Sequence, residues 1–205
     1  MPKHQLRILG PTFNLFPLNS FSLSRKVAQK EKDAFISARL SRMEKAYQDE
    51  GIRRSVEGVV LVHDHGHPFV LFLNLAGTFS KLPGGKLKTG EGEIDGLKRK
   101  LNMKLSPAIH GDNSPEWLIG ELISIWWRPN FETLFYPYVP PHITRPKECK
   151  KIFIVQLAKP CNFEAPSNYD LKAVPLFELY ENRGEYGPIN ASIPSCLSRF
   201  NFIFL

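Results

Sequence analysis

A glycine-rich loop that leads into an amphipathic helix, at residues 84–106, constrains the fold more than any other feature of this sequence. The Pro-Gly-Gly sequence at residues 83–85 interrupts a strand-like run, because proline and glycine are strong breakers of regular structure. Helical spacing of apolar residues then predicts a helix over residues 93–105, with Ile94, Leu97, Leu101 and Leu105 on one face. Gly96 inside this helix costs about 1 kcal/mol relative to alanine, which indicates close packing at that position. The segment therefore predicts a strand, a loop and a helix that packs tightly.

Hydrophobic periodicity predicts elements of both kinds in the rest of the chain. The first 27 residues read as an arm that packs on the domain through Phe13, Phe16 and Phe21. The predicted elements are a helix over 33–50, strands over 55–63, 69–75, 78–82, 117–127 and 151–157, an irregular proline-rich insertion over 128–146, and helical turns over 176–180 and 194–200. A turn is expected at residues 64–68. This order predicts one domain of α/β or α+β type over residues 28–205.

Composition excludes several classes of protein. A chain of 205 residues with 42% hydrophobic and 23% charged residues is typical of a globular domain with its own core. The formal net charge of +7 and the fifteen phenylalanines suit single-stranded nucleic acid, although a rich core under a cationic surface explains them equally well. Three distant cysteines favour reduced thiols over a zinc site or disulfides. Neither a signal peptide nor an apolar run of roughly 18–20 residues is present, so we expect a soluble intracellular protein without membrane contact.

The spacing Gly85, five residues, Glu91, seven residues, Arg99 resembles the Nudix box. In active Nudix hydrolases, glutamates on the box helix hold Mg²⁺ against a diphosphate, because this hard cation prefers oxygen ligands and offsets phosphate charge. Here the positions of the three glutamates hold Lys100, Met103 and Lys104, and the final glycine of the box is Ser106. Two would-be ligands are cations and the third is a thioether. We therefore expect no catalytic residue, no bound metal and no cofactor, on a Nudix scaffold whose loop is still braced by Glu91 and Arg99.

Most of the chain, from about Phe13 to Phe204, resembles one branch of the Nudix superfamily, the small subunit of pre-mRNA cleavage factor I. The matching words are RRSVEG (53–58), KLPGG (81–85), GLKR (96–99), WWRPNFE (126–132), YPY (136–138), HITRPKE (142–148), PLFELY (175–180) and LSRFNF (197–202). The resemblance implies a single α/β/α sandwich with a mixed sheet, an N-terminal arm and helix, and a C-terminal helical extension. It also implies a nuclear homodimer that binds UGUA elements upstream of poly(A) sites. Its further partners would be a larger RRM-containing subunit and the 3′-end processing machinery.

Carried over from that family, the RNA-binding positions are Glu31, Arg39, Glu57, Thr78, Phe79, Ser80, Leu82, Tyr186 and Gly187, and Tyr136 and Tyr138 would meet the larger subunit. Carboxylate and guanidinium groups can read the exposed edges of single-stranded bases, and an aromatic face can stack on a base. At Ser80 some relatives have a second aromatic, so we expect less side-chain packing there. Taken singly, these residues also fit ordinary roles, as surface ions or core aromatics.

Two other functions stay open at this point. A divergent Nudix hydrolase could use carboxylates outside the usual positions, such as Glu57, Glu91 or Glu93, although lysine and methionine are poor ligands for hard cations. A protein-interaction scaffold could keep a vestigial pocket, or one that binds a nucleotide without cleaving it. The alternation of His63, His65 and His67 through a turn also gives weak support for a metal site.

Overall fold

A mixed β-sheet forms the centre of the molecule in the computed structural model, which describes residues 11–30, 33, 35–75, 79–108 and 111–205. The main strand order is β10-β4-β3-β8-β7, with β5 paired to β4 and β6 paired to β3. The strands are β3 (Arg53–Asp64), β4 (His67–Leu75), β5 (Phe79–Lys81), β6 (Gly84–Lys86), β7 (Trp117–Arg128), β8 (Glu148–Leu157) and β10 (Tyr169–Pro175). The β3–β8 pair is parallel and the other pairs are antiparallel, which confirms the predicted mixed sheet.

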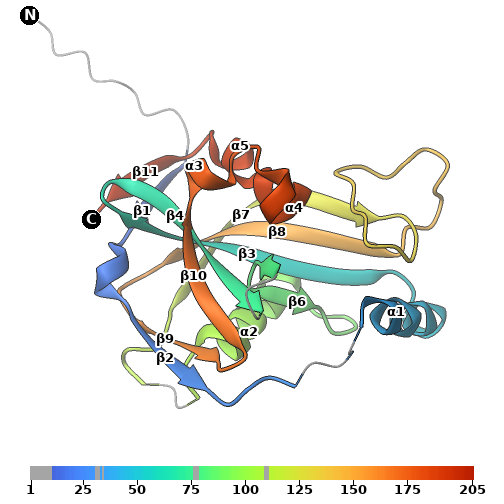
Figure 1. Cartoon of the computed structure of the whole chain (residues 1–205), viewed down its shortest axis with the longest axis horizontal. Helices are drawn as coiled ribbons and strands as arrows, with labels where there is room; N and C mark the ends of the chain where they lie inside the picture. The colour runs from blue at the N-terminus through green and yellow to red at the C-terminus, as the bar shows by residue number, and fades with distance from the viewer. Residues whose placement is uncertain (1–10, 31–32, 34, 76–78, 109–110) are drawn as a thin grey trace, which may run out of the picture.

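Helices cover both faces of this sheet (Figure 1). Helix α2 (Glu93–Leu105) packs on one face, where Leu97, Leu101 and Leu105 are fully buried against β3 and β8. Helices α3 (Leu176–Leu179), α4 (Arg183–Ala191) and α5 (Ile193–Leu197) lie on the other face. Because alternate strand residues point to opposite faces, β3 contributes to two separate cores. The α/β/α sandwich with a C-terminal helical extension is therefore confirmed. Within the described residues, no helix is long and apolar enough to cross a membrane.

The chain ends and their neighbours form two smaller sheets. Strand β1 (Thr12–Leu15) pairs in parallel with β11 (Asn201–Phe204), and β2 (Ser22–Lys26) pairs in parallel with β9 (Asn162–Pro166). A short 3-10 turn (Leu18–Ser20) joins β1 to β2. Helix α1 (Ile36–Glu50) lies at the end of the sheet where β3 begins (Figure 1).

Two predicted backbone features are confirmed. The chain turns between β3 and β4 through His65 and Gly66, whose φ angles are 47° and 75°, while Asp64 pairs with His67. Two positive φ angles are typical of the tight turn that suits a twisted hairpin. Gly96 does pack closely, since a Cβ there would lie 2.1 Å from Leu87 Cδ2 and 3.0 Å from Glu91 Oε2.

Several predicted boundaries and faces are wrong. Helix α1 begins at Ile36 rather than residue 33, and Ile36 itself is 65% exposed. Ile94 is 40% exposed because it lies in the first turn of α2, beyond the part of the helix that covers the sheet. The glycines expected to open a loop instead form β6, which lies against β3. Strands β1, β2, β9, β10 and β11 and helix α4 were not predicted.

Candidate nucleic-acid interface

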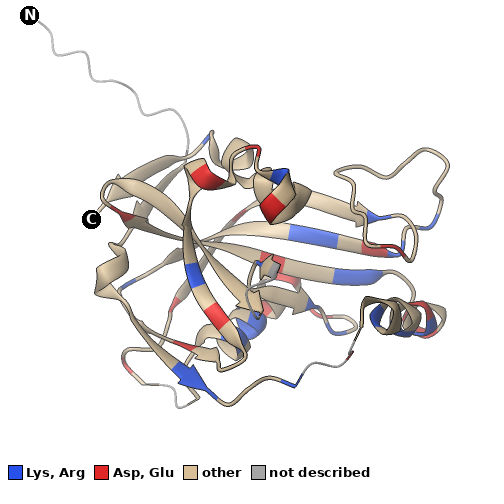
Figure 2. Cartoon of the chain, in the orientation of Figure 1, with Lys and Arg blue, Asp and Glu red and all other residues tan. Residues whose placement is uncertain are grey.

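Charged residues gather at the ends of β3, β7 and β8 that lie nearest to helix α1 (Figure 2). The carboxylate of Glu148, 2% exposed, accepts hydrogen bonds from Ser55 Oγ at 2.8 Å, Arg53 Nε at 3.2 Å and Arg128 Nε at 3.0 Å. Burial alone would raise the pKa of Glu148, but these cations outweigh it and lower the pKa. Burial lowers the pKa of Arg128, and repulsion from Arg39 and Arg53 adds to the effect. These residues therefore form a buried, cation-rich floor beneath the candidate site.

Glu57, a predicted base-reading residue, lies on the same face of β3 as this floor. Lys150 Nζ is 2.6 Å from Glu57 Oε1, and both side chains are 15% exposed. The ring of Phe135, from the proline-rich insertion, lies over both cations of the neighbouring strands, 4.9 Å from Lys150 Nζ and 4.1 Å from Arg128 Cζ. An aromatic face attracts cations, so the insertion fixes Lys150 and, through it, the Glu57 carboxylate.

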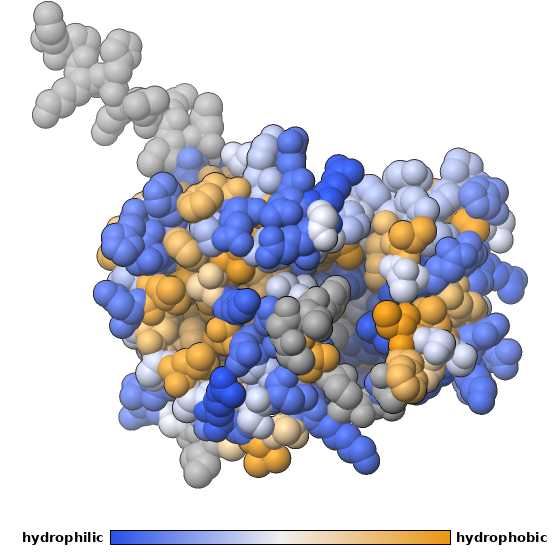
Figure 3. Space-filling model, in the orientation of Figure 1, coloured by the Kyte–Doolittle hydropathy of each residue, from blue (hydrophilic) through white to orange (hydrophobic). Residues whose placement is uncertain are grey.

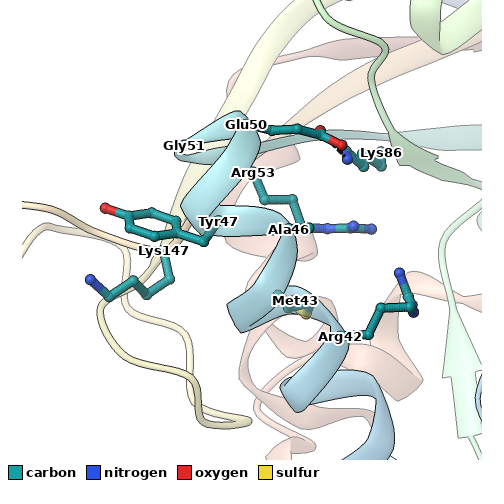
Figure 4. A pocket seen from close by; sticks show the side chains of 9 residues that line it. All are labelled: Arg42, Met43, Ala46, Tyr47, Glu50, Gly51, Arg53, Lys86 and Lys147. Carbon is teal, nitrogen blue, oxygen red and sulfur yellow. Dashed lines mark hydrogen bonds and ion pairs between the residues drawn. The ribbon is translucent and has the colours of Figure 1, made fainter.

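Helix α1 brings Arg39 to the edge of this cluster. Arg39 is exposed, and its charge reaches the buried Arg128. Figure 4 shows the seam between α1 and the sheet, where Glu50 points towards Lys86 and Tyr47 lies beside Lys147. The cavity at this seam has a volume of only about 30 Å³, too small for a nucleotide. The Glu50–Lys86 ion pair and the contact of Lys147 with the Tyr47 ring hold the helix at this position.

The other side of the site has two adjoining walls, one formed by β5 with the residues that follow it and the other by helix α4. Leu82, 3% exposed, and Tyr186, 8% exposed, belong to one core cluster. The Pro83 carbonyl accepts a hydrogen bond from the Gly58 amide at 2.9 Å, so the β5 wall runs directly beside the strand that carries Glu57. Helix α4 is kinked at Gly187, where φ is 76° and ψ is 168°. The space-filling view is hollowed between α4 and α1, above β3 and β8 (Figure 3).

The predicted RNA-binding residues that the structure describes lie in two adjoining groups. Ser80, Leu82, Tyr186 and Gly187 belong to β5, the residue after it and helix α4. Glu57 and Arg39 belong to the cation-rich cluster beside them. Glu31, Thr78 and the side chain of Phe79 lie outside the described residues, although the Phe79 backbone belongs to β5. The tyrosines predicted to meet a larger subunit lie in the insertion, with 5.8 Å between the ring centroids of Tyr136 and Tyr138. Tyr138 is 56% exposed, and Tyr136 pairs with the backbone of Trp127.

The Nudix-box segment keeps its brace. Arg99 donates two hydrogen bonds of 2.6 Å to the Glu91 carboxylate, which also accepts one from the Lys88 amide at 2.8 Å. The guanidinium of Arg99, followed by the Lys88 amide, lowers the pKa of Glu91 to about 2. The bidentate pair ties the loop to helix α2.

The three positions where active enzymes hold metal ligands point in different directions. Met103 is 43% exposed, whereas Lys104 is 7% exposed and donates a hydrogen bond to Gln29 Oε1. The Lys104 ammonium lies 4.9 Å from the centroid of the Tyr169 ring. The side chain of Lys100 runs past Gly85, where an added Cβ would come within 3.3 Å of Lys100 Cε.

Each carboxylate that a divergent hydrolase could use already holds a cation of the protein. Glu57 pairs with Lys150 and Glu91 with Arg99, while Glu93 pairs with Lys151 at 2.8 Å and Arg54 at 3.2 Å. No group of three or more His, Cys, Asp or Glu side chains that could hold a metal is found in the described part of the chain. His63 Nε2 lies 3.2 Å from the Leu205 carbonyl oxygen and the His67 ring packs on Phe177, so neither imidazole is directed at a common point.

Sequence reasoning missed Lys150, Phe135 and Arg128, which build the floor of the hollow. Strand register places Lys150, since it is opposite Ser55 in the parallel β3–β8 pair, and it places Arg128 opposite Glu148 in the β7–β8 pair. Neither pairing nor the contact of Phe135 with both cations leaves a local pattern in the sequence. A second hollow of about 380 Å³, lined by Ile52, Arg54, Glu93, Ile125, Trp127 and Lys151 among others, lies on the α2 face and holds none of the predicted RNA-binding residues.

Comparisons with known proteins identify the family of the chain. The chain matches the family NUDIX_2, described as nucleotide hydrolase, over residues 11–200. It is 53% identical to the pre-mRNA cleavage factor Im 25 kDa subunit 2 of Arabidopsis thaliana over 198 residues, which cover 95% of this chain and 96% of the relative. It is 48% identical to subunit 1 of the same organism, covering 92% and 85% of the two chains.

A third relative comes from another organism. The chain is 47% identical to the cleavage and polyadenylation specificity factor subunit 5 of Dictyostelium discoideum, over 95% of this chain and 96% of the relative. These similarities extend over nearly the whole length of each protein. The chain therefore belongs to the Nudix-like family of small cleavage factor I subunits, the family of cleavage and polyadenylation specificity factor subunit 5.

Proposed function

We propose that this chain acts in the 3′-end processing of pre-mRNA as the small subunit of cleavage factor I, by binding UGUA elements sequence-selectively and without hydrolysing nucleotides. It would work in the nucleus as a homodimer, and a larger RRM-containing subunit would bind at Tyr136 and Tyr138. The relatives that cover almost the whole chain are named as cleavage factor subunits, which supports the role in processing.

The observation that carries the RNA-binding part is the position of Glu57 in a cation-rich hollow. An ionised carboxylate accepts hydrogen bonds, and in an RNA site it can accept them from the N–H groups of guanine or uracil. The surrounding cations, Lys150, Arg128 and Arg39, attract the phosphate backbone without reading sequence. A sequence-selective site requires two parts, a group that selects the bases and cations that position the RNA strand. The Glu57 carboxylate and the surrounding cations fit these two roles.

Two observations support the absence of hydrolysis. Lys100 and Lys104 occupy positions where active Nudix enzymes carry metal-binding glutamates, and an ammonium group repels a divalent cation. Glu57, Glu91 and Glu93 are each held by a lysine or an arginine. Recruiting them as metal ligands would require breaking those ion pairs.

Fluorescence anisotropy with a labelled UGUA oligomer and a scrambled oligomer, at one fixed salt concentration, tests the proposal. We expect tighter binding of UGUA, and loss of this preference in Glu57→Gln, which keeps the shape and removes the charge. Glu121→Gln is the matched control, because Glu121 pairs with Arg199 at the surface, where its side chain is 46% exposed. Equal affinity of the wild type for both oligomers would refute sequence-selective binding.

A further inference from the structure

Asn190 lies behind the hollow and connects its two walls. Its side chain is 7% exposed, and Nδ2 donates hydrogen bonds to the Ser80 carbonyl at 3.1 Å and to the Tyr186 carbonyl at 3.0 Å. A side-chain amide has two N–H donors, so a single group serves one carbonyl of each wall. Ser80 belongs to β5, and Tyr186 precedes the kink of helix α4.

Both walls have little regular structure of their own at these points. Strand β5 is three residues long, and its ladder partner is the C-terminal end of β4. Helix α4 leaves helical dihedral angles at Gly187 and continues with Pro188, which has no backbone N–H to donate. A short strand and a broken helix turn are easily displaced, because few backbone hydrogen bonds hold them.

We infer that Asn190 is a positioning residue that sets the spacing between β5 and the α4 kink, and so keeps the RNA-binding hollow in a binding-competent shape. This inference rests on the function proposed above. The hydrogen bond reaches the main chain of Ser80 and does not depend on its side chain. This hydrogen bond therefore holds β5 in place at Ser80, where the small side chain packs less extensively than an aromatic ring would.

Replacing Asn190 has consequences that replacing an apolar core residue would not have. Without the amide, two carbonyl groups next to the hollow lose a donor, and a buried polar group without a partner is costly. The walls would then separate until water reaches the carbonyls. The Tyr186 ring and the β5 residues would no longer be held at one fixed distance, so RNA would have to order them on binding.

The test compares Asn190→Leu, which has a similar volume and no donor, with Asn102→Leu on the box helix. Asn102 also makes two side-chain hydrogen bonds, since its Oδ1 accepts from Trp117 Nε1 at 2.6 Å and from Ser106 Oγ at 2.9 Å, but it lies away from the hollow. We expect UGUA affinity to fall roughly fivefold in Asn190→Leu, the factor that corresponds to about 1 kcal/mol for one net hydrogen bond. Most of the fall should come from faster dissociation, and amide hydrogen exchange should accelerate at residues 79–82 and 183–187.

In Asn102→Leu we expect comparable loss of thermal stability with unchanged UGUA affinity and unchanged exchange in those two segments. Asn190→Ser, which removes the reach of the amide and admits water, is the second variant if Asn190→Leu does not fold. Equal effects of the Asn190 and Asn102 variants on RNA affinity would overturn the inference, as would unchanged exchange at 79–82. If the wild type shows no preference for UGUA, the proposed function fails separately, and exchange in the RNA-free protein still decides whether Asn190 joins the walls.

Discussion

Lys150 Nζ lies 2.6 Å from Glu57 Oε1, and the two side chains are equally buried, each 15% exposed. Lys150→Met leaves the Glu57 carboxylate without this partner in a poorly solvated place. We expect the free energy of unfolding to fall by about 3 kcal/mol, the lower end of the range found when one member of a buried pair is removed. Lys86→Met, which removes a lysine from the more exposed pair with Glu50, should have a much smaller effect, because water screens exposed ion pairs. Urea denaturation of both variants measures the difference, and equal losses would contradict a buried pair.

Phe79→Ala should weaken UGUA binding by about 1–3 kcal/mol, the usual contribution of one base stacked on an aromatic ring. Ser80→Ala keeps the main-chain carbonyl that accepts from Asn190 and should change the affinity much less. Anisotropy titrations of the two variants with the same oligomer give the comparison. Unchanged affinity in Phe79→Ala would remove this residue from the site.

The Glu91 carboxyl should titrate far below its ordinary value. Its pKa is lowered from 4.5 to about 2, chiefly by the Arg99 guanidinium. A carboxyl whose pKa is lower in the folded state than in the unfolded state contributes stability that is present above the unfolded pKa. This stability is lost as the pH falls through the folded pKa. The loop should therefore loosen between about pH 4.5 and pH 2. Carbon NMR of the carboxyl measures this directly; in Arg99→Gln the midpoint should return towards 4.5.

Incubation with Mg²⁺ or Mn²⁺ and a panel of dinucleoside polyphosphates should give no turnover above the buffer rate. Phosphate release after treatment with a phosphatase is a sensitive measure, and a working Nudix hydrolase serves as the positive control. Metal-dependent turnover by the purified protein would show that carboxylates outside the usual box positions carry the reaction. Loss of that turnover in Glu57→Gln or Glu93→Gln would then identify them.

Gly96→Ala should destabilise the protein although alanine favours helix. The added methyl group would meet Leu87 Cδ2 at 2.1 Å, and forced overpacking costs about 1–3 kcal/mol. Gly184→Ala in helix α4 is the matched control, because nothing lies within 4 Å of its Cβ position. There the helix propensity should stabilise the protein by up to about 1 kcal/mol. Thermal melts of both variants should therefore shift in opposite directions.

The amphipathic helix α2 and the long strands could be predicted from the sequence because their periodicity is determined locally. The tight turn at residues 65 and 66 could be predicted for the same reason, as a glycine-containing turn between two apolar runs. Strands β1 and β11 could not, since Thr12 pairs with Asn201 and neither segment shows a regular alternation. Strand β6 was hidden because its glycines usually mark a loop, and only contact with β3 makes them extended.

The residues of the site likewise fall into two groups, those that the sequence identified and those that only the fold brings together. Glu57 and Arg39 were identified through family resemblance, which compares positions and needs no geometry. Lys150, Phe135 and Asn190 act through contacts with segments far along the chain, such as the 110 residues that separate Asn190 from Ser80. Contacts of this length depend on how the sheet and the C-terminal helices are assembled. One sequence without its fold contains no local pattern that reveals them.

Lys104 ties the helix of the Nudix-like box to a distant segment of the chain. Its buried ammonium holds Gln29, which in turn is anchored by Asn168 through hydrogen bonds of 2.9 Å to its backbone N–H and carbonyl. A glutamate at residue 104 would place a carboxylate against the Gln29 oxygen and the negative face of the Tyr169 ring. A glutamate here would thus lose the link between helix α2 and the segment that leads to helix α1. A metal ligand at residue 104 would therefore require compensating changes at Gln29 and Tyr169.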